Sequence, residues 1–238
     1  KDVPILDRDI NGNRLTYLDS GATSQKPELV INEMSSVYSN INANVHRGTY
    51  VLSSETTAKY EDVRNKLKEF INAYSSDEII FTKGCTEGFN FLANSICKDL
   101  NPGDEIILSE IEHHANIIPW QIICKKTGAK IKYIRSTENG TINLEDLKKS
   151  LDSNVKIVSI THASNVFGTI NPVKEITNIV KKNGSKIMID GCQSIPHMKV
   201  NVKDLDCDFY AFSGHKMFGP TGVAVSYTHL TLPTIAIV

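Results

Sequence analysis

The chain has 238 residues, 40% of them hydrophobic, which is enough for one sizeable core or for a large domain with a small appendage. Its 26 basic and 27 acidic residues nearly cancel, so we expect neither a nucleic-acid partner held by a basic field nor a polybasic membrane patch. No segment is long and apolar enough to cross a bilayer. The five cysteines form no CxxC pair, which argues against a zinc site or a disulfide framework and favours a reducing compartment.

The first predicted element in chain order is a helix over residues 53–73. Apolar side chains recur there at helical spacing, and Ser53 or Ser54 is the expected N-cap. The apolar stripe consists of Tyr60, Val63, Leu67 and Phe70.

Between about residues 78 and 190, short β-branched runs alternate with helical patterns. The runs that we expect to be strands are EIIFT, DEIILSE, AKIKYIRS, VKIVSITH and SKIMID. The last helix of the series has Pro172 near its start and Gly184 just past its end, which is usual helix punctuation. Strands and helices that alternate at this spacing predict βαβ units, so the expected fold class is α/β with a mostly parallel sheet.

The two ends of the chain depart from this pattern. From Met217 to Val238 there is no Asp, Glu, Lys or Arg, and SYTHLTLPTIAIV has neither a helical period nor a clean strand alternation. A buried strand with a frayed end is one interpretation; we prefer a non-native tail of the kind that translated adapter sequence produces. We therefore assign residues 1–225 to one large domain and residues 226–238 to such a tail. Because the chain starts at Lys1, we expect the natural N-terminus to be missing; the expected location is cytoplasmic, or organellar if the missing part carries a transit peptide.

Several polar residues follow the predicted strands, where ligands bind in parallel α/β sheets. They are Thr86, His113, Asn165, Asp190, Gln193 and the run Ser213-Gly214-His215-Lys216. A lysine that can form a Schiff base, together with a carboxylate at a strand end, is what pyridoxal 5'-phosphate requires. Lys216 would hold the aldehyde carbon, and Asp190, which follows the apolar run KIMI, would keep the pyridine nitrogen protonated.

A phosphate site is predicted at KGCTEGFN, where a helix is expected to begin at about Glu87. Gly84 loosens the turn, Thr86 offers a hydroxyl, and the free amides of the first helical turn favour an anion. Ser213 and His215 could add two contacts from the other side, and His113 could stack on the cofactor ring.

Each of these residues also has an ordinary explanation. Lys216 could be a solvated surface charge, Asp190 a cap of the next turn, Thr86 a plain N-cap and GPTG a tight turn. The pair His113-His114 could bind a metal, although adjacent residues of a strand point to opposite faces. We prefer the cofactor, and no metal, because of the order and context in which these residues occur.

Five longer motifs resemble the cysteine desulfurases of the class V aminotransferase family, most closely their SUF-type (group II) branch. They are YLDSGATSQKP, EHHANIIPWQ, THASNVFGTINPVKEI, DGCQSIPHMKV and SGHKMFGPTG, and the likeness runs from about residue 4 to residue 225. It implies the large domain of a fold-type I pyridoxal-phosphate enzyme, normally a homodimer, with the small C-terminal domain missing. It also implies conversion of L-cysteine to L-alanine, with the sulfur passed as an enzyme persulfide to a SUF-type acceptor protein for iron–sulfur cluster assembly.

The resemblance implies a role for each candidate residue. Lys216 would hold the cofactor and shuttle protons on the substrate carbon, and His113 would stack on the ring and assist proton transfer. The other implied cofactor contacts are Thr86, Ser213 and His215 on the phosphate, Asp190 on the pyridine nitrogen, and Gln193 and Asn165 near the ring oxygen. Asn165 would also lie near the substrate carboxylate, and His46 with Arg47 would line the entrance to the site.

The sequence also departs from the family. The family's nucleophilic cysteine and its carboxylate-binding arginine lie well past the position of Lys216, in a region that is absent here. None of the five cysteines corresponds to that nucleophile: we interpret Cys85 as a small residue packed in a turn, and Cys192, like Gly21, as a packing variant. We therefore expect this chain to be an inactive fragment of a desulfurase.

Two alternatives remain at this point. The parent protein could be a selenocysteine lyase or another class V enzyme, which the missing C-terminal segment would distinguish. The chain could also be a non-catalytic scaffold that binds a sulfur-acceptor protein. A scaffold need not retain Lys216, Asp190, His113 and Gln193 together, and all four are present.

Overall fold

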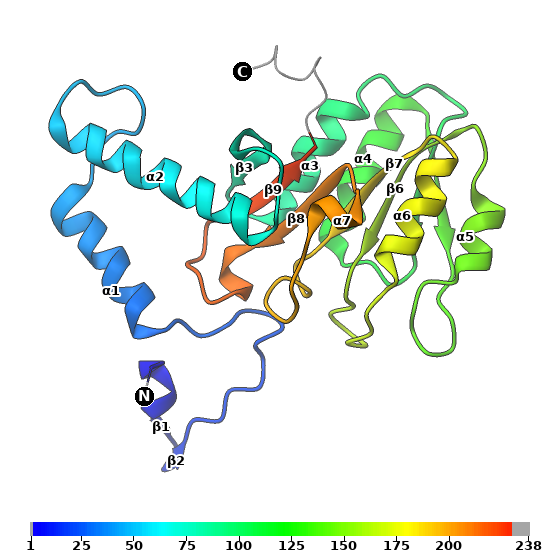
Figure 1. The fold of residues 1–238 in the computed structure, drawn as a ribbon. Helices are drawn as coiled ribbons and strands as arrows, with labels where there is room; N and C mark the ends of the chain where they lie inside the picture. Colours follow the sequence, from blue (N-terminus) through cyan, green and yellow to red (C-terminus); the bar gives the residue numbers. More distant parts are fainter. Residues whose placement is uncertain (1, 230–238) are drawn as a thin grey trace.

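The computed structural model describes residues 2–229 and contains a central seven-stranded sheet (Figure 1). Its strands are β3 (Ile79–Thr82), β4 (Glu105–Ser109), β5 (Lys130–Ile134), β6 (Val155–Thr161), β7 (Lys186–Asp190), β8 (Phe209–Ser213) and β9 (Ala224–Thr228). They lie in the order β3-β9-β8-β7-β6-β4-β5. Five neighbouring strands, β8, β7, β6, β4 and β5, are parallel to one another. The strand β9 is antiparallel to both of its neighbours, β8 and β3. The predicted α/β fold with a mostly parallel sheet is confirmed.

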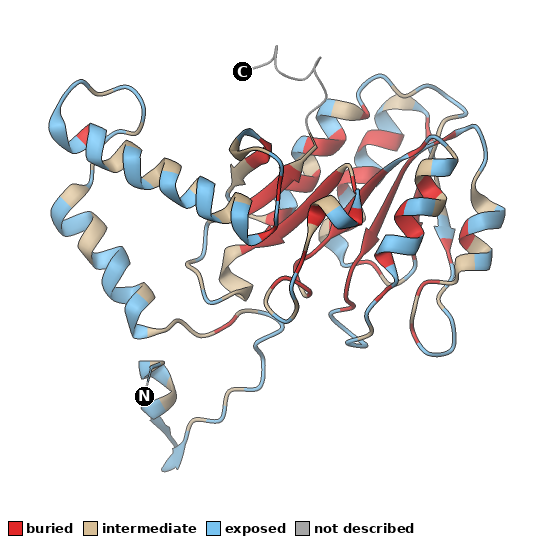
Figure 2. Ribbon diagram, in the orientation of Figure 1, coloured by how far each residue is buried: buried red, intermediate tan, exposed pale blue. Residues whose placement is uncertain are grey.

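Helices cover both faces of this sheet, as in other parallel sheets that are buried on two sides. They are α3 (Cys85–Ile96), α4 (Ile118–Thr127), α5 (Leu144–Ser150), α6 (Val173–Lys182) and the short α7 (Val202–Leu205). Neighbouring residues of a strand point to opposite faces, so Ile106 and Leu108 of β4 pack with α3 and α4. Ile107 packs in the second cluster, with α5, α6 and α7. Figure 2 shows the sheet as the most deeply buried layer.

The boundaries of α6 follow the sequence prediction. Pro172 is its N-cap, and Gly184 follows the helix with a φ of +80°, a conformation that glycine adopts without a Cβ clash. One face of the helix is buried by Val173, Ile176 and Val180. Punctuation and periodicity agree here, and for that reason the helix was predictable.

The N-terminal part projects away from the sheet (Figure 1). It consists of a 3-10 turn (Pro4–Asp7), the two-stranded pair β1 (Asp9–Ile10) and β2 (Asn13–Arg14), α1 (Glu28–Ser36), a π-helical turn (Val37–Ile41) and α2 (Val51–Phe70). Figure 2 shows α1 and α2 as mostly exposed, and α1 has no buried residue.

The predicted cap of the helix at residues 53–73 is wrong. The helix α2 begins at Val51 with Tyr50 as N-cap, so Ser53 lies inside its first turn, where its hydroxyl donates to the Asn44 carbonyl at 2.7 Å. The apolar stripe is only partly buried: Leu67 packs against the core, whereas Val63 is 48% exposed. Helical spacing identified the helix, but it could not show that Val63 and Phe70, half of the stripe, remain exposed.

The expected tail begins inside a strand. Ser226 and Tyr227 are buried in β9, where they pair with both β3 and β8. Residues 230–238, which make up most of that tail, lie outside the described residues. Within residues 2–229, none of the helices combines the length and apolarity that a bilayer span requires.

Candidate functional site

A cavity of about 820 Å³ opens at the carboxyl ends of the parallel strands. The strand β3 is antiparallel to β9, and β9 is antiparallel to β8, so β3 runs in the same direction as β8. The carboxyl end of β3 therefore lies at the same edge of the sheet. Eight predicted residues line this cavity: Thr86, His113, Asn165, Asp190, Gln193, Ser213, His215 and Lys216. The topology therefore gathers residues from five separate segments, as expected for a ligand site of a parallel α/β sheet.

Lys216 and Asp190 reach the cavity from adjacent strands. Asp190 is the last residue of β7 and is 4% exposed, and Lys216 ends the 3-10 turn Gly214–Lys216 directly after β8. Asp190 Oδ1 accepts a hydrogen bond from the Cys192 backbone N–H at 3.0 Å. Within the part of the chain that the structure describes, Asp190 Oδ2 and Lys216 Nζ have no hydrogen-bond or ion-pair partner. The cavity thus presents a carboxylate oxygen and an amine that are both free to bind a ligand.

The connection from β3 to α3 forms one end of the cavity. The helix begins at Cys85, two residues earlier than predicted, with Gly84 as N-cap. Thr86 therefore lies within the first turn rather than at the cap, and its hydroxyl has no partner among the described residues. A Cβ on Gly84 would meet no atom within 4 Å, so the space beside the first-turn amides is open. Free amides and a hydroxyl in an open first turn suit a phosphate.

His215 lines the cavity and links it to the N-terminal segment. Its Nδ1 lies 3.1 Å from the Thr23 hydroxyl, and its carbonyl accepts from the Ser24 backbone N–H at 3.0 Å. Burial lowers the pKa of His215, and the charges of Lys216 and Lys26 lower it further. A neutral His215 keeps a ring N–H or lone pair for a ligand without adding a buried charge. The sequence contains no local signal for this contact, which joins residues about 190 positions apart.

His113 is the N-cap of the 3-10 turn His114–Asn116. Its Nδ1 accepts the Ala115 backbone N–H at 3.1 Å, so the neutral ring carries its proton on Nε2. Burial is the main cause that lowers the His113 pKa; the Lys216 charge lowers it further, and Asp190 opposes both. His113 lines the cavity whereas His114 does not, and neither residue lies in the strand that the argument about opposite faces assumes.

Glu112, next to His113, was missed by the sequence analysis. It is 8% exposed and accepts hydrogen bonds from the Ser109 hydroxyl, the Asn116 amide at 2.7 Å and the Thr161 backbone N–H at 2.9 Å. Burial raises its pKa to about 8, although these three donors act in the opposite direction. Glu112 therefore fixes the segment that carries His113 to the end of β6.

Gln193 and Asn165 lie in the loops that follow β7 and β6. The Gln193 amide donates to the Gly21 carbonyl at 2.7 Å, which commits one of its two N–H groups to the N-terminal segment. The second N–H and the amide oxygen remain for a ligand. Asn165 lines the cavity with no side-chain hydrogen bond among the described residues.

His46 and Arg47 do not line this cavity. His46 lies before α2, where its Nε2 is 2.8 Å from Glu61 Oε1 and its ring meets Tyr60 edge-on at 5.5 Å. The interactions of His46 thus fall within the projecting N-terminal part. In this chain alone, the expected entrance residues are separate from the other eight.

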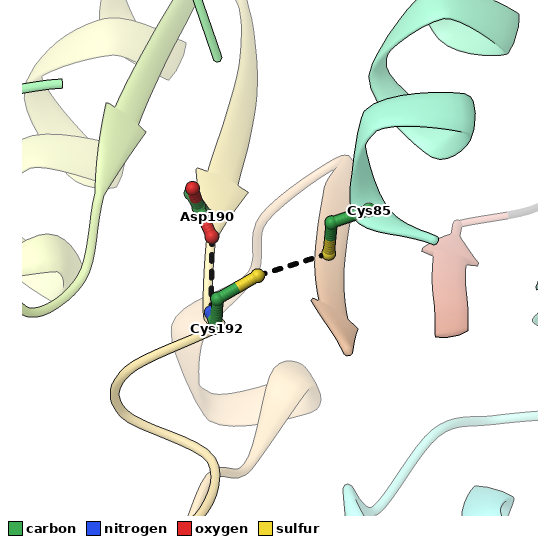
Figure 3. Close-up of side chains that lie close together, drawn as sticks. All are labelled: Cys85, Asp190 and Cys192. Carbon is green, nitrogen blue, oxygen red and sulfur yellow. Dashed lines mark hydrogen bonds between the residues drawn. The ribbon is translucent and has the colours of Figure 1, made fainter. Parts of the chain in front are cut away.

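The cavity also contains residues to which the sequence analysis gave no ligand role. They include Asp19, Lys83, Cys85, Thr161, Cys192 and Thr221. Cys85 is buried, as expected for a small packed residue, but it is the first residue of α3, and its Sγ lies 3.0 Å from Cys192 Sγ (Figure 3). Thr221 belongs to GPTG, which was considered only as a tight turn. A single sequence does not show which loop residues face inward, because that depends on how the strands are ordered.

Comparisons with known proteins agree with this geometry. The family model Aminotransferase class-V matches residues 16–234. A protein of Halalkalibacterium halodurans named "Probable cysteine desulfurase" is 51% identical over 225 residues, and a cysteine desulfurase of Salmonella typhimurium is 46% identical over 227 residues. These alignments cover 94% and 95% of this chain but 55% and 56% of the relatives. The chain therefore spans about half the length of the curated relatives it matches.

Solved structures give the same result. The apo structure of a cysteine desulfurase from Thermococcus onnurineus superposes with a TM-score of 0.88 at 39% identity, covering 96% of this chain and 55% of that one. The cysteine desulfurase CsdA from Escherichia coli, in its S-sulfonic acid form, superposes with a TM-score of 0.82 at 37% identity, covering 90% and 54%. The chain belongs to the aminotransferase class-V family, whose members use pyridoxal 5'-phosphate as their cofactor.

Proposed function

We propose that the protein to which this chain belongs is a cysteine desulfurase that converts L-cysteine to L-alanine and retains the sulfur as a persulfide. The observation that carries the proposal is the meeting of an unpaired lysine, Lys216, and a buried carboxylate, Asp190, in one cavity. The names of relatives at 46–51% identity support cysteine as the substrate. The activity is proposed for the whole protein, because the alignments cover only about half of those relatives.

The cavity residues fit pyridoxal phosphate. The volume of about 820 Å³ lies in the range of small-molecule sites, roughly 300–1,000 Å³. Lys216 supplies the amine for the aldehyde, the free Asp190 oxygen suits a protonated pyridine nitrogen, and Thr86 with the first turn of α3 suits the phosphate. Ser213 and His215 also line the cavity. When bound, the cofactor supplies an electron sink for the carbon that bears the substrate amine.

Two groups of this chain can move protons beside such a cofactor. Lys216 Nζ has no competing partner among the described residues. His113 carries its neutral-form proton on Nε2, and its lowered pKa keeps the ring uncharged near neutral pH. An uncharged ring can stack on a cofactor without repelling the Lys216 ammonium.

We further propose that residues 1–225 are the cofactor-binding large domain and that this chain binds the cofactor without releasing sulfur. The relatives are about twice as long, and neither Cys85 nor Cys192 occupies a loop that could carry sulfur away: both are buried at the base of the cavity. A SUF-type acceptor protein, iron–sulfur cluster assembly, homodimer formation and a cytoplasmic location also remain proposals. Release of alanine from L-cysteine and L-selenocysteine by the whole protein would distinguish a desulfurase from a selenocysteine lyase.

The cofactor assignment is tested by adding pyridoxal phosphate to the 238-residue chain and to Lys216→Ala. We expect a visible absorbance band in the wild type, and borohydride should fix the cofactor to the peptide that contains residue 216. The alanine variant should form neither. A band of equal strength in both proteins, or cofactor fixed to another lysine, would contradict the proposed role of Lys216.

A further inference from the structure

Cys85 and Cys192 approach each other at the base of the cavity from two segments that are far apart in the sequence (Figure 3). Cys85 is the first residue of α3, and Cys192 follows Asp190, the last residue of β7, by two positions. Their sulfur atoms are 3.0 Å apart. The contact arises because α3 packs against β8, the neighbour of β7 in the sheet, and the sequence has no CxxC spacing that would predict it.

The two thiols have different surroundings. The Cys192 S–H donates to Cys85 Sγ, and this hydrogen bond, followed by burial and the Asp190 charge, raises the pKa of Cys192 well above its usual value. Cys192 is therefore a protonated donor at neutral pH. Cys85 lies in the first turn of a twelve-residue helix, where backbone N–H groups without a helical partner favour negative charge. The pair thus consists of a donor thiol, Cys192, and an acceptor sulfur, Cys85, in the first turn of α3.

Both cysteines are nearly buried and face the cavity, which offers small reagents a route to their sulfur atoms. Cys85 is 6% exposed and Cys192 is 8% exposed, and both line the cavity. The remaining cysteines, Cys97, Cys124 and Cys207, are buried elsewhere and do not line it. Burial raises the pKa of Cys97 and Cys207 to about 12 and that of Cys124 to about 11, which keeps these three as unreactive thiols.

We propose that Cys85 and Cys192 are a redox-modification site that closes to a disulfide when a peroxide enters the cavity. The Cys85 sulfur attacks one peroxide oxygen, the O–O bond breaks, and a sulfenic acid and a molecule of water form. The Cys192 sulfur then displaces the hydroxyl group from Cys85, and the Cys192 proton leaves with it as a second water. Two thiols lose two electrons and two protons, and one hydrogen peroxide is reduced to two waters.

Little movement is needed for this bond. The sulfurs must approach by about 1 Å, from 3.0 Å to the bond length of about 2.05 Å. Closing the bond requires a shift of Cys85, the first residue of α3, toward Cys192, and a Cβ on the preceding Gly84 would meet no atom within 4 Å. If the proposed function is correct, that shift displaces Thr86 relative to Asp190, and we expect the oxidised chain to bind pyridoxal phosphate less tightly.

The test treats the 238-residue chain with hydrogen peroxide and counts its thiols after denaturation. The five thiols should fall to three, and dithiothreitol should restore them. Peptide mapping of the wild type should find one linked pair, containing residues 85 and 192. Cys192→Ser should stop at a sulfenic acid on Cys85 that dimedone traps, and Cys207→Ser, the matched control, should still lose two thiols.

Peptide mapping of the wild type decides the proposal even if a variant folds poorly. Cys85 and Cys192 that stay reduced, that pair with other cysteines, or that link two chains would overturn it. The result is independent of the cofactor: Lys216→Ala should form the same disulfide. Failure of cofactor binding leaves the thiol count unchanged, so the two proposals can fail separately.

Discussion

Glu112 offers a quantitative test of the buried polar group beside the cavity. Its pKa is raised from 4.5 to about 8, so the folded state holds a proton that the unfolded state releases above pH 4.5. The stability from this proton is fully present below pH 4.5 and is lost as the pH rises through 8. Between about pH 6.5 and 8.5 this loss is about 2 kcal/mol of unfolding free energy, at 1.36 kcal/mol per pH unit where the proton difference is complete.

This pH window is chosen because the other shifted histidines act mainly at or below its lower edge, and their effect is the same in the wild type and in the variant. His162, with a pKa lowered to about 4 by burial, and the lowered pKa values of His113 and His215 act at lower pH. Glu112→Gln cannot ionise, so its unfolding free energy should lose about 2 kcal/mol less across the window than that of the wild type. The variant also alters the hydrogen bond with Asn116, which lowers stability at every pH but does not change the slope.

The assay is urea unfolding at several pH values across the window, with tryptophan fluorescence as the signal that monitors unfolding. Glu55→Gln is the matched control, because Glu55 is exposed, and it should keep the wild-type slope. Equal slopes for Glu112→Gln and the wild type would show that Glu112 is already ionised at neutral pH. In that case the three donors outweigh burial, and the reasoning is refuted.

Three further predictions concern the cavity and the core. Asp190→Asn keeps an acceptor for the Cys192 N–H but removes the carboxylate, so pyridoxal phosphate should bind more weakly by about 1.5–3 kcal/mol in a fluorescence titration, whereas Asp99→Asn should have no effect. Thr86→Val should weaken pyridoxal phosphate by about 1 kcal/mol and leave pyridoxal unaffected; equal losses for both would exclude a phosphate contact. His162 contributes a stability loss of about 3 kcal/mol as the pH falls from 6.5 to about 4, because the buried imidazole favours its neutral form, and His162→Gln should remove this contribution from the acid slope measured by urea unfolding. An unchanged acid slope would mean that His162 stays accessible to protons.

The sequence was sufficient for the sheet and for most of the cavity for one physical reason. In a parallel α/β chain, hydrophobic runs identify the strands, and connections of regular handedness place their carboxyl ends on one edge. Residues at or just after the end of a hydrophobic strand, such as Asp190 and Lys216, are therefore expected to lie close together. His46 and Arg47 precede an exposed helix instead of following a strand, and the same logic gives them no place in the cavity.

What the sequence could not provide are the contacts between loops. The burial of Glu112 depends on how the segment after β4 packs against Thr161 at the end of β6. The contact of Gln193 with Gly21 depends on the path of the N-terminal segment. From the sequence alone, the residues in both contacts cannot be distinguished from polar residues at the surface. The errors in the cap at Ser53 and in the start of α3, predicted at about Glu87, have a related origin, since helix starts depend on where the chain leaves its turn.

Cys85 and Cys192 show why position in the fold changes the meaning of a residue. Each was interpreted alone as a small packing residue, and each alone is compatible with that role, because both are buried. Their joint placement suggests more than packing. Cys85 is the first residue of α3, Cys192 lies two residues after Asp190, and their sulfur atoms are only 3.0 Å apart. The thiol pair lies between the helix terminus that we propose for the phosphate and the carboxylate that we propose for the cofactor ring, so under these proposals the redox state of the two cysteines affects the shape of the cavity. Thiol counting and cofactor titration on the same oxidised sample can therefore measure that coupling directly.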